Sequence, residues 1–361
     1  MKRILSLIAV LGIACIIAVQ PTVAEAATSF PDVPENNRFH DEIQYLVNKE
    51  IISGYSNGKF QPKRNVTRGE AAIMIGRMLG YDGRPTATRF TDVTAQNGAS
   101  GYISEAAVYG IISGYPDRTF RPNEYITRGD MAIFLARAFD IETGSIREFK
   151  DVREQMKAYS SIRNIAGDFI TTGYSDGTFR PASKVTREQF SAFLARGLSP
   201  EYKQRTVKKD GYSRDMTKKY VFSSPNGDIR MEYKKTMGQF GELHYAGFFW
   251  VIQGPKSGDI WYIQQEETDE MLIESYPFSN YEIALKYPVK VGTSWSGYGL
   301  SETDALKITG VNKTIKTPYK TFTNVVEVNE KGYKHYYVKG VGHVKTVDPT
   351  GKLVSELKSI R

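Results

Sequence analysis

The sequence predicts an α + β multidomain protein, in which a helical bundle of three repeats precedes a mainly antiparallel β domain. Three observations support this fold class. A phrase centred on Tyr55, Tyr115 and Tyr174 recurs at offsets of 60 and 59 residues. Apolar residues within each copy follow the period of a helix, and aromatic segments after residue 220 alternate as in strands. The 361 residues, of which 40% are apolar, are enough for more than one core.

The first 26 residues are predicted to be a secretory signal peptide. Met1-Lys2-Arg3 is basic, Ile4 to Val19 is almost continuously apolar, and an A-x-A step ends at Ala26. The alternative is a retained membrane anchor, but the apolar run is short for a membrane-spanning helix. We therefore expect cleavage after Ala26, with the membrane contacted only through the signal before cleavage.

Cys15 is the single cysteine and lies inside this apolar run. A lipoprotein signal has a leucine-like residue three positions before its cysteine, where this chain has Gly12. The mature protein is therefore expected to contain no disulfide, no thiolate metal site and no cofactor.

Each repeat keeps the same internal spacing. In every copy an aspartate in a Phe-x-Asp-Val phrase precedes the tyrosine by 23 residues, and a Thr-Arg pair follows it. Because the length varies only where copies join, each copy is one structural unit. The predicted repeats are residues 27–86, 87–145 and 146–200.

A repeat is predicted to consist of a helix, an ordered loop and a second helix. Ile43, Leu46, Val47 and Ile51 form one apolar stripe in the first copy. Gly54, Gly114 and Gly173 are predicted to end the first helices with a positive φ. Two such helices cannot bury their own apolar stripes, so the three copies are expected to share one core.

The second helix of each repeat is predicted to begin with a capping box, Thr67 with Glu70 in the first copy. The third copy has Gln189 in place of this acid and Glu188 in place of a small residue. We therefore predict the third repeat to be the weakest binding unit.

Together the copies resemble the S-layer homology (SLH) domain, with its phrases F-x-D-V, then G-I-I-x-G-Y-x-D-G-T-F-x-P, then I-T-R-A-E, over about residues 28 to 200. The resemblance implies a pseudo-threefold helical bundle with grooves between neighbouring repeats. It also implies non-covalent binding of secondary cell-wall polysaccharide, including pyruvylated forms, at the surface of a Gram-positive cell.

Three kinds of residue are the polysaccharide-binding candidates. Arginine suits a ketal-pyruvate carboxylate because it is a bidentate donor, aspartate accepts sugar hydroxyls, and tyrosine offers a ring face. The candidates are Arg68, Arg128, Arg187, Asp32, Asp92, Asp151, Tyr55, Tyr115 and Tyr174. Structural alternatives exist for each kind: an ion pair with a repeat acid for the arginines, an N-cap for the aspartates, and packing between repeats for the tyrosines.

Beyond the repeats, residues 201–219 are basic and poor in apolar side chains, and are predicted to be a linker. Residues 220–361 are predicted to form the β domain, with hairpin turns at Asn226-Gly227 and Gly351-Lys352. The segments Thr317–Val325 and Tyr336–Val344 resemble a β-rich module of exported bacterial proteins, T-P-x-G-T-F-x-N-V and Y-Y-x-x-G-V-G-x-V, although Lys320 replaces the glycine. This resemblance implies no activity.

No pattern in the chain predicts catalysis or nucleic-acid binding. The net charge is +8, but no run of basic residues marks a phosphate-tracking face. His335 and His343 have no zinc-site spacing, Glu242 and His244 form only an isolated Glu-x-His, and no Gly-x-Ser-x-Gly elbow occurs. No catalytic and no metal-binding residue is therefore predicted.

The sequence thus predicts a secreted cell-wall or S-layer protein that is anchored by its repeats and displays a β domain. The alternative is a wall-anchored hydrolase with its active site in the β domain. The identity of the sugar, the occupied grooves and the oligomeric state stay open.

Overall fold

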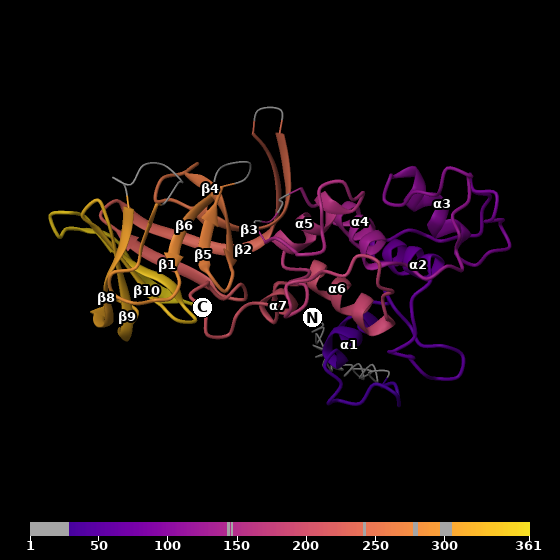
Figure 1. Cartoon of the computed structure of the whole chain (residues 1–361), viewed down its shortest axis with the longest axis horizontal. Coiled ribbons are helices and arrows are strands. Elements are labelled where there is room, and N and C mark those ends of the chain that lie inside the picture. The colour runs from indigo at the N-terminus through magenta and orange to yellow at the C-terminus, as the bar shows by residue number, and fades with distance from the viewer. Residues whose placement is uncertain (1–28, 143–144, 146, 241–242, 277–280, 297–304) are drawn as a thin grey trace, which may run out of the picture.

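The computed structural model describes residues 29–142, 145, 147–240, 243–276, 281–296 and 305–361. The predicted signal peptide, Cys15 and Glu242 lie outside these residues. The helices gather at one end of the molecule and the strands at the other, with α7 between them (Figure 1). The predicted fold class, a helical bundle followed by an antiparallel β domain, is confirmed. No helix in the described part of the chain is long and apolar enough to cross a membrane.

The described helices form three pairs and one short connecting helix. They are α1 (His40–Asn48), α2 (Arg68–Met78), α3 (Ser100–Val108), α4 (Arg128–Ala138), α5 (Tyr159–Gly167), α6 (Arg187–Leu198) and α7 (Pro200–Gln204). The second helix of each repeat packs against the first helix of the next, α2 on α3, α4 on α5 and α6 on α1. The third repeat therefore returns to the first, and the three repeats share one core as predicted.

Three backbone hydrogen bonds close this arrangement into a ring. Val66 N donates to Val185 O (2.9 Å), Val185 N to Ile126 O (3.3 Å), and Ile126 N to Val66 O (2.9 Å). All three residues are fully buried. Each stands two positions before the Arg of its repeat, so this pseudo-threefold junction fixes where the three Thr-Arg caps lie.

The first helices end earlier than predicted. The left-handed residues that follow them are Glu50 (φ 58°), Gly110 (φ 71°) and Phe169 (φ 57°). Gly54, Gly114 and Gly173 lie four residues further along. Gly173 has the predicted positive φ (74°), but none of the three ends a helix, and all three are required for another reason. A Cβ at Gly114 would lie 2.5 Å from Phe90 Cε1 and 2.5 Å from the carbonyl oxygen of Thr119. The missing side chain thus lets the Phe of the Phe-x-Asp-Val phrase pack on the loop.

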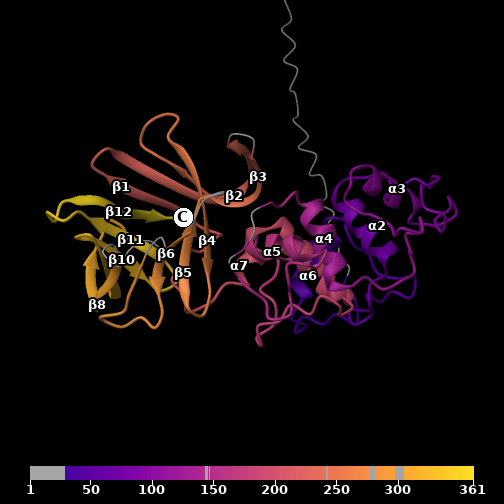
Figure 2. The ribbon, with the colours of Figure 1, turned by 45° about the horizontal axis from the view of Figure 1, so that its top comes forward.

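In the described part of the chain, twelve strands form one antiparallel sheet. They are β1 (Lys219–Ser224), β2 (Gly227–Phe240), β3 (Leu243–Gln253), β4 (Ile260–Glu267), β5 (Met271–Ser275), β6 (Tyr281–Lys286), β7 (Ser294–Ser296), β8 (Ala305–Lys316), β9 (Thr321–Glu330), β10 (Tyr333–Val338), β11 (Gly342–Val347) and β12 (Leu353–Ile360). Their order is β6-β5-β4-β3-β2-β1-β12-β11-β10-β9-β8-β7. The sheet curves strongly (Figure 2), and its two edges meet where Trp295 Nε1 of β7 donates to Ile283 O of β6 (2.7 Å).

Both predicted hairpin turns are confirmed, since β1 ends and β2 begins around Asn226 and the turn between β11 and β12 contains Gly351. The sheet buries two clusters of side chains. One is centred on Tyr220, Trp250 and Val325, and the other on Leu285, Trp295 and Val328.

Residues 201–219, predicted to be a linker, are packed in the structure. Tyr202 and Lys203 of α7 are buried, and so are Tyr212 and Arg214. The backbone amide of Tyr212 donates to Glu267 (2.8 Å), and Arg214 pairs with Glu274 (2.6 Å). The basic residues of this segment have acidic partners both in the repeats and in the sheet, such as Asp41 for Arg205 and Glu274 for Arg214.

A buried ion pair joins the helical part to the sheet. Lys203 Nζ of α7 donates to the carboxylate of Asp168 and to its carbonyl oxygen (2.6 Å), and both side chains are at most 2% exposed. The amide of Phe248 in β3 donates to the same carboxylate (3.1 Å). Two side chains of the helical part and one backbone amide of the sheet therefore meet at a single buried charge centre.

Candidate functional site

The three Thr-Arg phrases cap the second helices. Thr67, Thr127 and Thr186 are the N-caps, and each hydroxyl accepts the amide of the third helical residue. The third repeat keeps its cap although Gln189 replaces the acid. The amide oxygen of Gln189 accepts Thr186 N (3.2 Å) and completes a capping box, as Glu70 does for Thr67. In the second repeat the carboxylate of Asp130 accepts a hydrogen bond from the hydroxyl of Thr127 (3.0 Å), in place of one from its backbone amide.

The arginine of each cap inserts into the next repeat. Its Nε donates to the carbonyl oxygen of that repeat's Phe-x-Pro phenylalanine. Arg68 bonds Phe120 (2.8 Å), Arg128 bonds Phe179 (2.8 Å) and Arg187 bonds Phe60 (2.9 Å). The arginines are only 3%, 4% and 6% exposed, so they first of all fasten one repeat to the next.

The predicted tyrosines lie at the same three junctions. Arg68 lies over Tyr115 at 5.1 Å from the ring centre, Arg128 over Tyr174 at 4.9 Å, and Arg187 over Tyr55 at 4.5 Å. The structure thus brings each predicted arginine together with the predicted tyrosine of the next repeat. The tyrosines therefore pack between repeats, which is the structural alternative given for them above.

A second guanidinium, not predicted from the sequence, lies against each tyrosine. Arg121 lies 3.9 Å from the ring centre of Tyr115 and Arg180 lies 3.9 Å from that of Tyr174. In the first repeat Arg64 takes this place over Tyr55 at 5.1 Å. The signal was present, because copies two and three read Phe-Arg-Pro where copy one reads Phe-Gln-Pro.

The outer arginines of repeats two and three are held by aspartates of the same loop. Arg121 pairs with Asp117 (3.0 Å) and Arg180 with Asp176 (2.8 Å). Hydrogen bonds from Thr119 and then Arg121 lower the pKa of Asp117 to about 2. These carboxylates therefore stay ionised at any physiological pH.

The predicted aspartates hold the loop between the helices. Both carboxylate oxygens of Asp92 accept backbone amides, of Phe120 and Arg121 (2.7 Å each). Asp32 and Asp151 accept the two equivalent amides of their own loops. The N-cap alternative is wrong, because the residues before α1, α3 and α5 are Phe39, Ala99 and Ala158. The aspartates thus position the tyrosine and arginine of each junction.

The three junctions differ in the acid that faces the buried arginine. Asp130 lies 3.8 Å from Arg68. Near Arg187, Glu70 accepts the hydroxyl of Tyr55 (2.9 Å) and pairs with Arg64 (2.5 Å). At the Arg128 junction the equivalent residue is the neutral Gln189, and of the three buried arginines only Arg68 has a carboxylate within 4 Å among the described residues. Burial lowers the pKa of Arg128, and it lowers the pKa of Arg187 in the same direction.

Two histidines of the β domain come together, although their spacing in the sequence gave no signal. The hydroxyl of Thr346 contacts both His343 Nε2 (2.7 Å) and His335 Nδ1 (3.1 Å). His343 is packed between the rings of Phe222 and Tyr337. Among the described residues no group of three potential metal ligands is found. His244 lies on β3, but its side chain is outside the described part.

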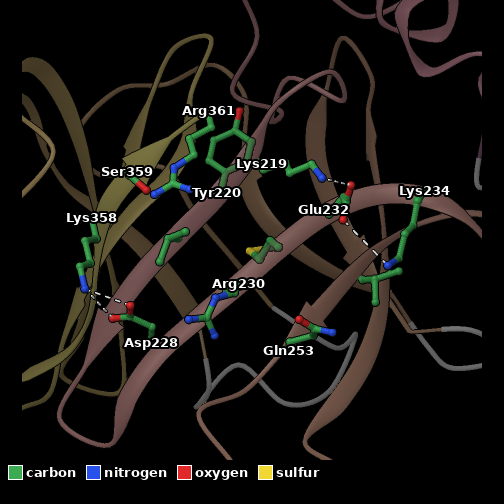
Figure 3. Close-up of a pocket in the computed structure, with 13 residues that line it drawn as sticks. Lys219, Tyr220, Asp228, Arg230, Glu232, Lys234, Gln253, Lys358, Ser359 and Arg361 are labelled. Carbon is green, nitrogen blue, oxygen red and sulfur yellow. Dashed lines mark hydrogen bonds and ion pairs between the residues drawn. The ribbon is translucent and has the colours of Figure 1, made fainter. Parts of the chain in front are cut away.

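The outer face of the sheet has a hollow of about 580 Å³ over β1, β2, β3 and β12 (Figure 3). A second hollow, of about 950 Å³, lies where residues 208–212 meet the ends of β8, β9 and β10. Thr323 and Asn324 of the first module segment and Val338 and Lys339 of the second line it, so the two segments meet there.

Comparison with known proteins identifies the helical part. Residues 29–72, 89–132 and 148–191 match the model of the S-layer homology domain. The cellulosome-anchoring protein of Acetivibrio thermocellus is 29% identical over 191 residues, covering 50% of this chain and 41% of that protein. The S-layer protein of Bacillus thuringiensis subsp. finitimus is 31% identical over 192 residues, covering 51% of this chain and 23% of that protein.

An endoglucanase of Bacillus sp. is 31% identical over 177 residues, 47% of this chain and 18% of that enzyme. The chain thus spans less than half the length of each of these relatives. Three matched repeats, closed into a ring by the backbone hydrogen bonds of Val66, Ile126 and Val185, show that the helical part consists of three S-layer homology domains and that the protein is secreted and cell-wall-associated.

Proposed function

We propose that the repeats anchor the protein non-covalently to anionic secondary cell-wall polysaccharide, and that the β domain is displayed from the wall. The observation that carries this proposal is the junction between repeats, where a buried guanidinium from one repeat meets a tyrosine and an outer arginine of the next. Two guanidinium groups around one ring provide several donors for a carboxylate such as a ketal-pyruvate.

We assign the strongest anion binding to the junction of Arg128, Tyr174 and Arg180. A buried cation without a carboxylate partner gains most from an incoming anion, because its charge is otherwise poorly compensated. At the other junctions Asp130 and Glu70 already supply negative charge. The substitution of Gln189 for the acid thus favours this site.

Anchoring is tested by sedimentation of the mature chain with purified cell walls. The chain is expected to pellet with intact walls and to stay in solution once hydrofluoric acid has removed the polysaccharide. Equal sedimentation with stripped walls would refute anchoring to this polymer.

The assignment of the site is tested with Gln189→Glu. Glutamate keeps the capping box, so the Tm is expected to hold, but it places a carboxylate near Arg128. We expect binding to walls to weaken about tenfold, the effect of roughly 1.4 kcal/mol. Asp130→Asn is the matched control, since it removes the acid near Arg68 and is expected to leave binding equal or stronger. Unchanged binding by Gln189→Glu would exclude the Arg128 junction.

The role of the arginines themselves is tested with Arg180→Gln and Arg128→Ala. Arg180 is exposed, so its replacement is expected to weaken wall binding with little change in Tm. Arg128→Ala removes the hydrogen bond to the carbonyl oxygen of Phe179, so it is expected to lower both the wall binding and the Tm. A Tm loss without any loss of binding in either variant would make these arginines purely structural.

The hydrolase alternative for the β domain stays open. Some relatives of this chain, such as the endoglucanase, are named as enzymes, but no contact among the described residues favours catalysis over display. A displayed module that binds a wall component is therefore the simpler proposal for residues 220–361.

A further inference from the structure

The hollow on the outer face of the sheet is built by two rows of side chains that cross neighbouring strands. Strand pairing places Ser359, Val221, Arg230 and Gln253 in one row. The next row contains Arg361, Lys219, Glu232 and Val251, where Arg361 and Lys219 exchange both backbone hydrogen bonds (2.9 and 3.0 Å). Because side chains alternate between the two faces of a strand, Tyr220, Met231 and Trp250 point into the core and both rows face outward.

Cationic side chains dominate this hollow. Five basic residues line it and only two carboxylates do, as Figure 3 shows. The basic residues are Lys219, Arg230, Lys234, Lys358 and Arg361. Counting side chains alone, five positive charges and two negative charges leave an excess of three.

Both carboxylates are already neutralised by lysines. Glu232 pairs with Lys219 (2.6 Å) and lies 3.9 Å from Lys234, while Asp228 pairs with Lys358 (2.9 Å). These pairs are the dashed contacts in Figure 3. Arg230 and Arg361 have no carboxylate within 4 Å among the residues that the structure describes. The two groups best suited to bidentate anion binding are thus the two left unpaired.

The backbone holds these arginines on a rigid surface. Arg230 lies in β2, which is paired with strands on both sides, and Arg361 is bound to the start of β1. Strands are about 4.8 Å apart, so the cationic groups spread over several strand widths. Charges spread in this way match several anionic groups along a chain better than they match one small anion.

The floor of the hollow distinguishes between kinds of polyanion. Between the cations it offers Val221 and the buried Val251, and the one aromatic side chain of the lining, Tyr220, is 1% exposed. Proteins that bind single-stranded nucleic acid use exposed rings on which bases stack. An aliphatic floor instead suits the carbon skeleton of a sugar or polyol.

From this arrangement we infer that the β domain has its own binding site, centred on Arg230 and Arg361, for a flexible polyanion without aromatic bases. The anionic groups are phosphates or carboxylates carried on a sugar or polyol chain. The protein is wall-associated, so this site adds a second contact with an anionic polymer. Two linked contacts strengthen attachment without any change in either site.

The test uses the full chain with two pure probes, linear polyphosphate for phosphate groups and polygalacturonate for carboxylates. The double variant Arg230→Gln/Arg361→Gln is compared with Lys307→Gln/Lys334→Gln, which removes the same charge from exposed positions on β8 and β10. We expect the arginine variant to bind at least one probe about tenfold more weakly, with a shallower salt dependence, and the lysine control to bind as the parent does.

The probe that loses affinity identifies the anion. Equal losses in both double variants, or no loss with either probe, would overturn the proposal. Tighter binding of a single-stranded oligonucleotide through the same arginines would overturn the assignment to a polymer without bases. Gln189→Glu is run alongside: because it acts only on the junction between repeats, a failure of the anchoring proposal is separable from a failure of this one.

Discussion

At position 189 an amide stands where the other two repeats have an acid. Gln189 is the third residue of α6 and is equivalent to Asp130, which lies 3.8 Å from Arg68 of the preceding repeat, so by this equivalence Gln189 belongs to the junction of Arg128. From the sequence, the missing acid suggested a weakened third repeat. Because each cap serves the arginine of the preceding repeat, the missing acid instead leaves Arg128 without a carboxylate.

His343 is expected to make stability depend on pH. Burial, followed by the charges of His335 and Arg214, holds the pKa of His343 well below 6.5. The unfolded chain therefore takes up a proton near pH 6.5 while the folded chain does not. The free energy of unfolding should fall as the pH drops below about 6.5, by at most about 1.4 kcal/mol per pH unit.

Urea denaturation at pH 7.5 and pH 5.5 measures this effect. In His343→Gln, which cannot titrate, the difference between the two pH values is expected to shrink by about 1 kcal/mol or more. An unchanged difference would show that other groups carry the pH dependence.

At the scale of the helix, the ends of α1, α3 and α5 form a natural comparison. The same left-handed position is Glu50 in the first repeat, Gly110 in the second and Phe169 in the third. Only the second has the residue that adopts this conformation without strain. Phe169 is buried in the core of the sheet, and this packing offsets the backbone strain.

Glu50→Gly is expected to stabilise the protein. Glu50 is exposed, so the change relieves backbone strain and loses no packing; we expect the free energy of unfolding to rise by about 0.5–1 kcal/mol. Lys49→Gly, at the preceding position with φ −92°, is the matched control. It should lower the free energy of unfolding by a similar amount. Thermal unfolding of both variants decides the matter, and equal effects would contradict the strain argument.

At the scale of the whole molecule, the buried Asp168–Lys203 pair sets the relation between repeats and sheet. Ser145 and Arg147 add contacts with Glu266 (2.7 Å) and with the carbonyl of Glu267 (3.1 Å). The β domain is therefore held against the repeats and is not carried on a flexible tether.

Lys203→Met is expected to destabilise the chain by about 3–5 kcal/mol, because it leaves the Asp168 carboxylate buried without its cation. Adding Asp168→Asn should recover much of this loss. Chemical denaturation measures both effects. A small loss in the single variant would mean that the interface does not depend on this charge pair.

The sequence by itself determined the repeats, their spacing, the caps and the β character of the second half, because these depend on residues close together in the chain. The fixed Asp-to-Tyr and Tyr-to-Arg offsets already pointed to one unit used three times. The two hairpin turns likewise depend on residues that are neighbours in the sequence.

Only the tertiary structure decided which side chains meet across the repeats and across the sheet. Packing and strand pairing that no local pattern encodes bring together Arg128 and Tyr174, His335 and His343, and Arg230 and Arg361. The same is true of residues 201–219, whose charged side chains find partners far away in the sequence, such as Asp168 for Lys203, Asp41 for Arg205 and Glu274 for Arg214. Local chemistry thus defines the elements, and long-range pairing decides which charges are left to bind a ligand.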